Sequence, residues 1–194
     1  MTKSAMLSNL EHMNRACTEC ELRTGLGAFV FGYGNVDSPI VFVSEEPFVQ
    51  RTDELLHQRL EEAGFQRQDV YITHIVKCCP SRKPTLSQRD KCLPWLRKQY
   101  SILKPSVMVL LGLKAAQTIL DKDIKMKQCR GKWFRRGNTK MMPVYHPEAV
   151  VRNPLWREIF IDDLRWVKKV CFDDPRLIKN VCKSVSRVSD TAAQ

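Results

Sequence analysis

The stretch "DVYITHIVKCCP" (residues 69–80) decides the fold that this sequence predicts. Residues 69–76 are rich in β-branched and aromatic side chains, which is typical of a buried strand. A histidine, a lysine and two adjacent cysteines stand in the last part of this stretch, namely His74, Lys77, Cys78 and Cys79. Such residues either close an ordinary strand or act as ligands and recognition groups, so the rest of the chain must distinguish the two interpretations.

Short apolar runs elsewhere in the chain predict three more strands, "IVFVS" (40–44), "SVMVLLG" (106–112) and "KMMPVYH" (140–146). Apolar periodicity predicts helices between and around the strands, at residues 5–16, 52–63, 87–103, 113–120 and 153–167. Thr52 and Ser87 are the expected helix caps, and Pro94 is expected to kink its helix or to mark its true first turn. Strands that alternate with helices predict an α/β sheet with parallel pairing.

The length of 194 residues and the 43% hydrophobic composition predict one globular domain with its own core. We assign residues 1–171 to this domain. Residues 172–194 form an extension that is expected to hold at most one helix before a disordered end. The longest apolar runs have the length of strands and not of membrane spans, and the first residues lack the apolar core of a signal peptide. We therefore expect a cytoplasmic, nucleoid-associated protein without a membrane partner.

The charge balance favours a polyanionic partner. There are 32 Lys and Arg against 21 Asp and Glu, a net charge of +11, and the isoelectric point is near 9.4. Basic residues gather between 122 and 140, where Trp133 and Phe134 lie among them, which is typical of a surface that follows phosphates and stacks on bases. The alternative is a solvated loop with two aromatic residues tucked into the domain. The predicted DNA-binding residues of this loop are Arg130, Lys132, Arg135 and Arg136.

Four of the eight cysteines have a spacing that suggests a metal site. Cys17 and Cys20 form a CxxC pair before the first strand, Cys78 ends the second strand, and Cys92 lies near the start of the next helix. Four thiolates can hold zinc or a [4Fe-4S] cluster, and spacing does not separate these two cases. Buried cysteines without a ligand are the alternative. Cys79 is expected to point to the opposite face of the strand from Cys78.

Seven motifs, taken in order, resemble the family 4 type of uracil-DNA glycosylase from about residue 17 to residue 167. They read "CTEC", "IVFVSEEP", "DVYITHIVKCCP", "KCLPWL", "VMVLLGLKAA", "RGKW" and "MPVYHPEAVVRNP". The resemblance implies a three-layer α/β/α domain with a central four-stranded parallel sheet. It also implies a [4Fe-4S] cluster on Cys17, Cys20, Cys78 and Cys92, and removal of uracil from DNA.

The same resemblance implies roles for five residues after the strands. His146 is similar to the family histidine that donates a hydrogen bond to the uracil carbonyl, and Glu45 to the glutamate of the first motif. Phe48 matches the phenylalanine that stacks on the base. Ser44 stands where the family has a glycine, and His74 where it has an asparagine that reads the base edge.

The loop after His146 resembles the element that enters the minor groove, so Arg152 is expected to contact the DNA backbone. The first motif is shorter than that of the family. The segment "SRKPTLSQRDK" (81–91) lacks the histidine of the covalent uracil-trapping relatives, so we reject their mechanism.

Two functions of different classes follow from these patterns. The first is a glycosylase of base-excision repair, monomeric, acting on single- or double-stranded DNA and on uracil or a related deaminated base. The second is a catalytically inactive or altered DNA-binding module of the same fold, attached to replication or repair proteins. A zinc-stabilised regulatory protein would explain the cysteines but not the ordered motifs. Lys77 is expected to border the DNA-facing surface.

Overall fold

The computed structural model describes residues 1–23, 28–79, 83–173 and 186–187. Its centre is a parallel sheet of four strands, whose spatial order is β3, β2, β4, β6. These strands are β2 (Ile40–Ser44), β3 (Tyr71–His74), β4 (Val107–Leu111) and β6 (Thr139–Val144), and every residue in them is buried. Full burial explains why they are continuous apolar runs in the sequence. The prediction of a parallel α/β core is confirmed.

Three outer strands extend this core into a mixed seven-stranded sheet and were not predicted. They are β1 (Gly32–Gly34), antiparallel to β3, β5 (Phe134–Arg136), antiparallel to β6, and β7 (Ser186–Arg187), parallel to β5. The backbone of β1 passes very close to Val70, the residue that precedes β3. A Cβ at Gly34 would overlap the carbonyl oxygen of Val70, and φ is +107° there, so only glycine fits well. The helix predicted in the extension lies outside the described residues.

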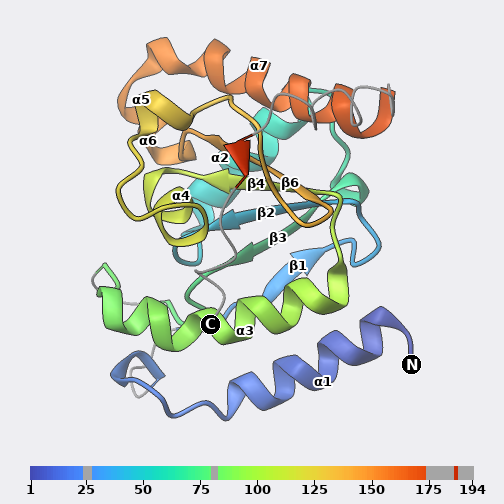
Figure 1. Ribbon diagram of the computed structural model, residues 1–194, viewed down its shortest axis with the longest axis vertical. Helices are drawn as coiled ribbons and strands as arrows, with labels where there is room; N and C mark the ends of the chain where they lie inside the picture. Colours follow the sequence, from blue (N-terminus) through green and yellow to red (C-terminus); the bar gives the residue numbers. More distant parts are fainter. Residues whose placement is uncertain (24–27, 80–82, 174–185, 188–194) are drawn as a thin grey trace.

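Helices cover both faces of the sheet, which confirms the three-layer prediction (Figure 1). One face carries α1 (Lys3–Arg15), α3 (Leu86–Leu103), α4 (Leu113–Ile119) and α5 (Met126–Cys129). The other face carries α2 (Gln50–Glu62), α6 (Pro147–Arg152) and α7 (Arg157–Lys168). Single turns connect them at Glu21–Arg23, Arg67–Asp69, Pro154–Trp156 and Lys169–Asp173. Alternate strand residues divide between two cores, so Phe42 faces α2 and α7 while Val41 and Val43 face α1 and α3.

Two predicted helix caps are wrong. The cap of α3 is Thr85, because its hydroxyl accepts from the Gln88 amide while the Gln88 side chain accepts from the Thr85 amide. Pro94 lies within α3. Thr52 lies inside α2, buried, and donates its hydroxyl to Glu148 at 3.1 Å. This contact joins α2 to α6.

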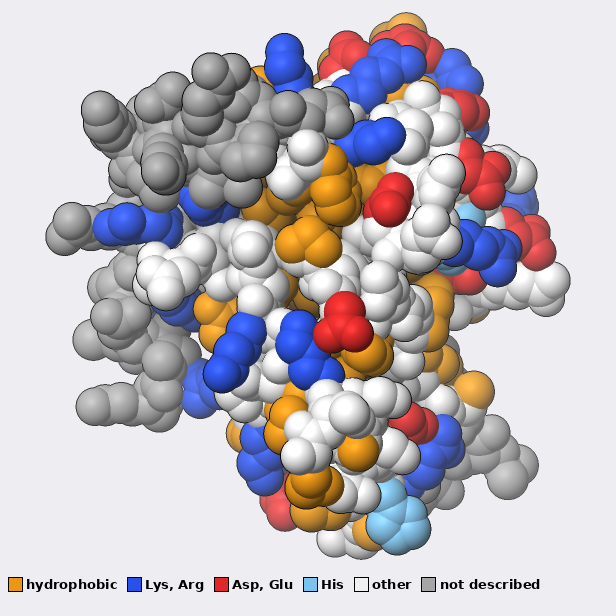
Figure 2. All heavy atoms as spheres, turned by 90° about the vertical axis from the view of Figure 1, so that its right-hand side faces the viewer, with side chains coloured by type: hydrophobic (Ala, Val, Ile, Leu, Met, Phe, Trp, Pro, Cys, Tyr) orange, Lys and Arg blue, Asp and Glu red, His pale blue; other side chains and the backbone are white. Residues whose placement is uncertain are grey.

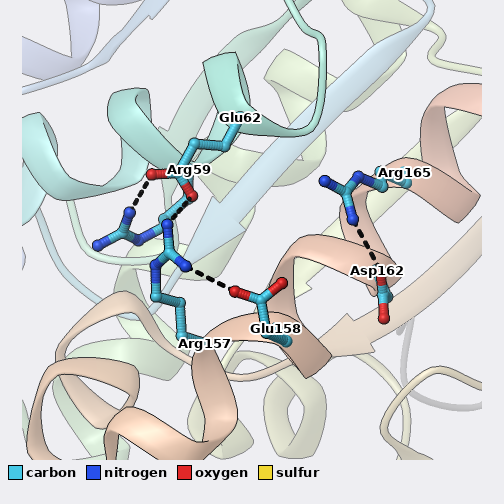
Figure 3. A network of polar contacts seen from close by, with 6 residues as sticks. All are labelled: Arg59, Glu62, Arg157, Glu158, Asp162 and Arg165. Carbon is cyan, nitrogen blue, oxygen red and sulfur yellow. Dashed lines mark hydrogen bonds and ion pairs between the residues drawn. The ribbon is translucent and has the colours of Figure 1, made fainter.

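Ion pairs connect α2 and α7 on the outer surface (Figure 3). Arg157 bonds both Glu62 of α2, at 2.9 Å, and Glu158, at 2.6 Å, while Arg59 also contacts Glu62. Exposed pairs of this kind contribute about 0–1 kcal/mol each. Acidic and basic side chains lie intermixed near the top of the face in Figure 2, where Figure 1 places α7. The excess of positive charge is therefore not uniform over that face.

Within the described segments, no helix is both long and apolar enough to span a membrane.

Candidate functional site

Three of the predicted site residues meet where the parallel strands end. His74 is the last residue of β3, His146 follows β6 and caps α6, and Phe48 lies in the turn after β2. The Phe48 ring centroid is 5.2 Å from that of His74 and 5.5 Å from that of His146. Figure 1 shows β2 and β3 running toward the side on which α4 and α6 lie. The carboxyl ends of parallel strands are the usual position of binding sites in such sheets.

The tautomer of His74 is set by Ser44. The Ser44 hydroxyl donates to the carbonyl oxygen of Glu46 at 2.7 Å, and its oxygen lies 2.6 Å from Nδ1 of His74. Since a hydroxyl has one proton, the Ser44 oxygen must accept from a protonated Nδ1. Nε2 of His74 then carries the lone pair. This atom is buried and has no hydrogen-bond partner among the described residues.

Burial also keeps His74 uncharged. It lowers the pKa of His74 well below 6.5, and the charges of Lys77 and His146 act in the same direction. A hydrogen bond to the carbonyl of Glu46 opposes the shift. The side chain therefore presents a single hydrogen-bond acceptor in an apolar environment.

His146 presents a hydrogen-bond donor, whereas His74 presents an acceptor. Its Nδ1 accepts from the backbone amide of Glu148 at 3.3 Å, so the proton of the neutral ring is on Nε2. Burial lowers its pKa, Glu148 raises it and Arg152 lowers it further. Gly112 makes room for this ring, since a Cβ there would lie 3.0 Å from Cβ of His146. A neutral histidine at this point can donate from Nε2.

The two adjacent glutamates after β2 have different environments. Glu45 forms an ion pair with Arg89 of α3, with 3.3 Å between Oε1 and Nε, and both side chains are largely buried. Glu46 was not predicted as a site residue. Burial raises its pKa, as do the nearby charges of Glu45 and Glu148, while Lys83 lowers it. Only the first glutamate matches a recognisable motif, and its neighbour carried no signal beyond its adjacency.

Another polar cluster lies beside His74. Tyr33 of β1 donates its hydroxyl to Asp53, and Asp53 lies 3.8 Å from Nε2 of His57. The Tyr33 ring centroid is 6.4 Å from that of His74. Burial raises the pKa of Tyr33, and Asp53 adds to the effect. No sequence pattern pointed to Tyr33, because its segment looked like a glycine-rich loop.

Two of the predicted metal ligands, Cys17 and Cys78, lie near enough to Cys92 of α3 for their charges to act on it. Burial raises the pKa of Cys92 to about 11, and the nearby thiols of Cys78 and Cys17 raise it further, while Lys77 lowers it. Burial raises the pKa of Cys79, and the charge of Glu46 raises it further, so its surroundings differ from those of Cys92. Over residues 1–23, 28–79, 83–173 and 186–187, no group of three or more His, Cys, Asp or Glu side chains has the arrangement of a metal site. The donor chemistry of these thiols fits zinc or an iron-sulfur cluster.

Lys77 is buried and does not border a DNA-facing surface, so that prediction is wrong. Its ammonium donates to the Thr73 hydroxyl at 2.6 Å, to the Phe31 carbonyl at 3.1 Å and to the Gln99 side chain. Burial lowers its pKa to about 7. Three oxygen acceptors compensate for the loss of water around this nitrogen.

Some of the predicted DNA-binding side chains are exposed, and others already make contacts within the protein. Arg152, at the end of α6, is exposed and lines a hollow of about 280 Å³ with Val49, Arg51, Thr52 and Glu148 among others. Lys132 is also exposed, and Arg135 is half-buried in β5. Arg130 contacts both carboxylate oxygens of Asp163 at 2.8 Å, and Arg136 donates to the Ile119 carbonyl at 2.7 Å. The last two have structural contacts in addition to any role in binding.

Comparison with known proteins places this geometry in a family. The profile of the uracil DNA glycosylase superfamily matches residues 31–171. The chain is 34% identical over 185 residues to the type-4 uracil-DNA glycosylase of Thermotoga maritima, which covers 86% of this chain and 95% of that protein. It is 34% identical over 178 residues to the type-4 enzyme of Archaeoglobus fulgidus, which covers 80% and 88%. A DNA polymerase of Bacillus phage SP01 is 27% identical over 146 residues, 69% of this chain and 16% of that protein. This chain belongs to the uracil DNA glycosylase superfamily.

Proposed function

We propose that the protein hydrolyses the N-glycosidic bond of uracil, or of a related deaminated base, in DNA after the nucleotide is flipped out of the stack. The observation that carries this proposal is the group of His74, His146 and Phe48 at the strand ends, where two neutral histidines of opposite hydrogen-bonding character contact one aromatic ring. Base flipping requires an aromatic platform together with polar groups that contact the base edge.

His146 supports the bond-breaking step. When the bond to the sugar breaks, negative charge develops on the departing base, and a donor that is already in place stabilises it without reorganisation. Nε2–H of His146 is such a donor, because Nδ1 is occupied by the Glu148 amide. Phe48 would hold the flipped base by stacking.

The carboxylates after β2 would serve the attacking water. Glu45 is held by Arg89, so it is suited to orienting a water molecule by accepting a hydrogen bond. Burial raises the pKa of Glu46, so its carboxylate is a stronger proton acceptor than that of an ordinary glutamate. Removing the base leaves an abasic site as the product.

A [4Fe-4S] cluster would be held by the thiol corner, which we define as Cys17, Cys20, Cys78 and Cys92, with zinc as the alternative occupant. The cluster would act as a cross-link between the end of α1, the end of β3 and α3, and the hydrolysis requires no electron transfer from it. Burial and the charge of Glu46 raise the pKa of Cys79, and these surroundings support its exclusion from the ligand set.

A glycosylase assay tests the proposed activity. Full-length protein purified without oxygen is incubated with single- and double-stranded oligonucleotides that contain one uracil, and alkali then cleaves any abasic site. We expect cleavage at the uracil position, and none in the matched thymine oligonucleotide. Intact uracil substrates in the presence of bound protein would overturn the proposal.

The pH dependence of excision follows from His146. Because burial lowers its pKa, the ring stays neutral above the ordinary value of about 6.5 and for some distance below it. The charged groups that influence it are Glu148 and Arg152, and His74 is close. We expect a single-turnover excision rate that is flat from about pH 8 to about pH 6.5 and falls only at lower pH. A rate that already halves between those two values would contradict the assignment.

Arg152→Ala is expected to weaken DNA binding in a salt-dependent way. Arg152 is exposed beside the site, so removing one phosphate contact should reduce the slope of log affinity against log salt by about 1. Fluorescence anisotropy at several salt concentrations measures the slope. Arg165→Ala, which removes an exposed arginine of α7 paired with Asp162, is the matched control. An equal slope in Arg152→Ala and wild type would remove Arg152 from the DNA contact.

The second candidate function is DNA binding without turnover, within replication or repair. His74 in place of the family asparagine, and a first motif shorter than that of the family, favour it. The similarity to part of a phage DNA polymerase also fits a module that works beside replication proteins. Equal affinity for uracil-containing and normal DNA, with no abasic product, would favour this second function.

A further inference from the structure

We propose that His74 recognises the base through one hydrogen-bond acceptor, Nε2, and that with His146 it selects bases that present a ring N–H beside a carbonyl group. This edge, a lactam, is present in uracil, hypoxanthine and xanthine and absent from cytosine and adenine. Thymine and guanine also carry it, so the contact separates uracil from cytosine and adenine and not from these two bases. The inference rests on the proposed function and names the substrate class of the same site.

The acceptor character of His74 comes from its neighbours. Ser44 gives its only proton to the Glu46 carbonyl and therefore accepts from Nδ1–H, which leaves the lone pair on Nε2. The side chain is fully buried, and Nε2 has no partner in the part of the chain that the structure describes. A buried acceptor without a partner is unfavourable, so a ligand that brings a donor to it gains free energy.

The second half of the recognition comes from His146. Its Nε2–H is a donor, since Nδ1 already accepts from the Glu148 amide. Both imidazole rings contact the ring of Phe48, that of His74 at an interplanar angle of 89° and that of His146 at 57°. An acceptor and a donor thus flank one stacking platform, which matches a ring N–H and its adjacent carbonyl oxygen.

The arrangement also rejects cytosine and adenine. In the same orientation, cytosine places a ring nitrogen lone pair against the lone pair of Nε2. Adenine does the same, and it also sets an amino group against the His146 donor. Two facing acceptors repel each other, which is selection by mismatch. An imidazole with one available atom gives no donor to a second carbonyl, so uracil gains nothing from its other carbonyl at His74.

Equilibrium binding separates base recognition from catalysis. The probes are single-stranded oligonucleotides with one 2′-fluoroarabino nucleotide, which resists cleavage, carrying uracil, N3-methyluracil or cytosine. N3-methyluracil retains both carbonyls but lacks the ring N–H. We expect full-length wild type to bind the uracil probe about 10- to 100-fold more tightly than the other two. Equal affinity for uracil and N3-methyluracil would overturn the inference.

Substitutions at His74 and Ser44 assign the discrimination to the acceptor. His74→Phe keeps an aromatic ring but removes the acceptor, and we expect affinities for uracil and cytosine within about twofold of each other. Ser44→Ala removes the oxygen that accepts from Nδ1–H of His74. We therefore expect a partial loss of the discrimination between uracil and cytosine. Circular dichroism and thermal unfolding verify that each variant is folded. Full discrimination in folded His74→Phe would overturn the inference.

His74→Asn adds a donor beside the acceptor, because an amide offers both. We expect this variant to shift its preference from hypoxanthine, which has one carbonyl, toward uracil, which has two. An unchanged ratio would overturn the single-acceptor assignment. Excision of ordinary uracil substrate is measured in parallel. Discrimination without excision overturns only the proposed glycosylase function, and excision without dependence on the ring N–H overturns only the inference about His74.

Discussion

His146→Ala is expected to lower the single-turnover rate of uracil excision by about 10²- to 10³-fold, the usual effect of removing one donor to a developing negative charge. The reason is local, because Nε2–H of His146 is oriented by the Glu148 amide on the other ring nitrogen and lies against Phe48. Substrate binding relies mainly on phosphate contacts and should change little. Rapid-quench measurement at saturating enzyme isolates the chemical step.

A matched histidine variant controls for nonspecific effects. His12 lies on α1 and is exposed, on the face of the sheet opposite α6, so His12→Ala should excise uracil at the wild-type rate. If His146→Ala retains more than about a tenth of the wild-type rate while remaining folded, the ring is not the principal stabiliser of the departing base.

Cys78→Ser is expected to abolish binding of the iron-sulfur cluster and to lower thermal stability. Wild type purified without oxygen should carry about four iron and about four sulfide ions per chain, with visible absorption. The Cys78 thiol lies close to that of Cys92, so a serine at this position removes a ligand from the centre of the thiol corner. Since ligand binding contributes to folding free energy, the variant should also unfold at a lower temperature.

The neighbouring cysteine provides the control. Cys79→Ser changes the same atom type one residue away, at a thiol whose pKa responds to Glu46 and not to the other cysteines. It should keep its iron and sulfide. Loss of both ions from Cys79→Ser, or their retention in Cys78→Ser, would exclude the proposed ligand set. One equivalent of zinc and no iron in wild type would instead identify a zinc site.

The central strands could be predicted from sequence because burial on both faces leaves continuous apolar runs such as residues 40–44 and 106–112. The outer strand Phe134–Arg136 could not, because it is short, half-buried and rich in arginine, which resembles a loop. Its strand character comes from pairing with β6, a contact between segments that local sequence does not reveal.

The candidate site was predictable in its members more than in its chemistry. Phe48, His74 and His146 could be named because their motifs resemble those of the family, and the structure brings them together. The acceptor state of His74 depends on the Ser44 hydroxyl of a different strand, 30 residues away along the chain. The burial of Lys77 likewise depends on Gln99 of α3. Such properties arise from long-range packing, so spacing along the chain does not encode them.

The burial of Lys77 has a consequence for mechanical coupling within the molecule. Lys77 lies between His74 and Cys78 in the chain, and its ammonium joins Thr73, the Phe31 carbonyl and Gln99 of α3. The two amides that precede it are also held, since Ile75 donates to the carbonyl oxygen of Ser44 and Val76 to that of Glu45. This short segment is therefore a stiff link between the thiol corner and the histidine beside Phe48. A group bound by the cysteines would therefore restrict the position of His74 in the site, without any transfer of electrons to the substrate.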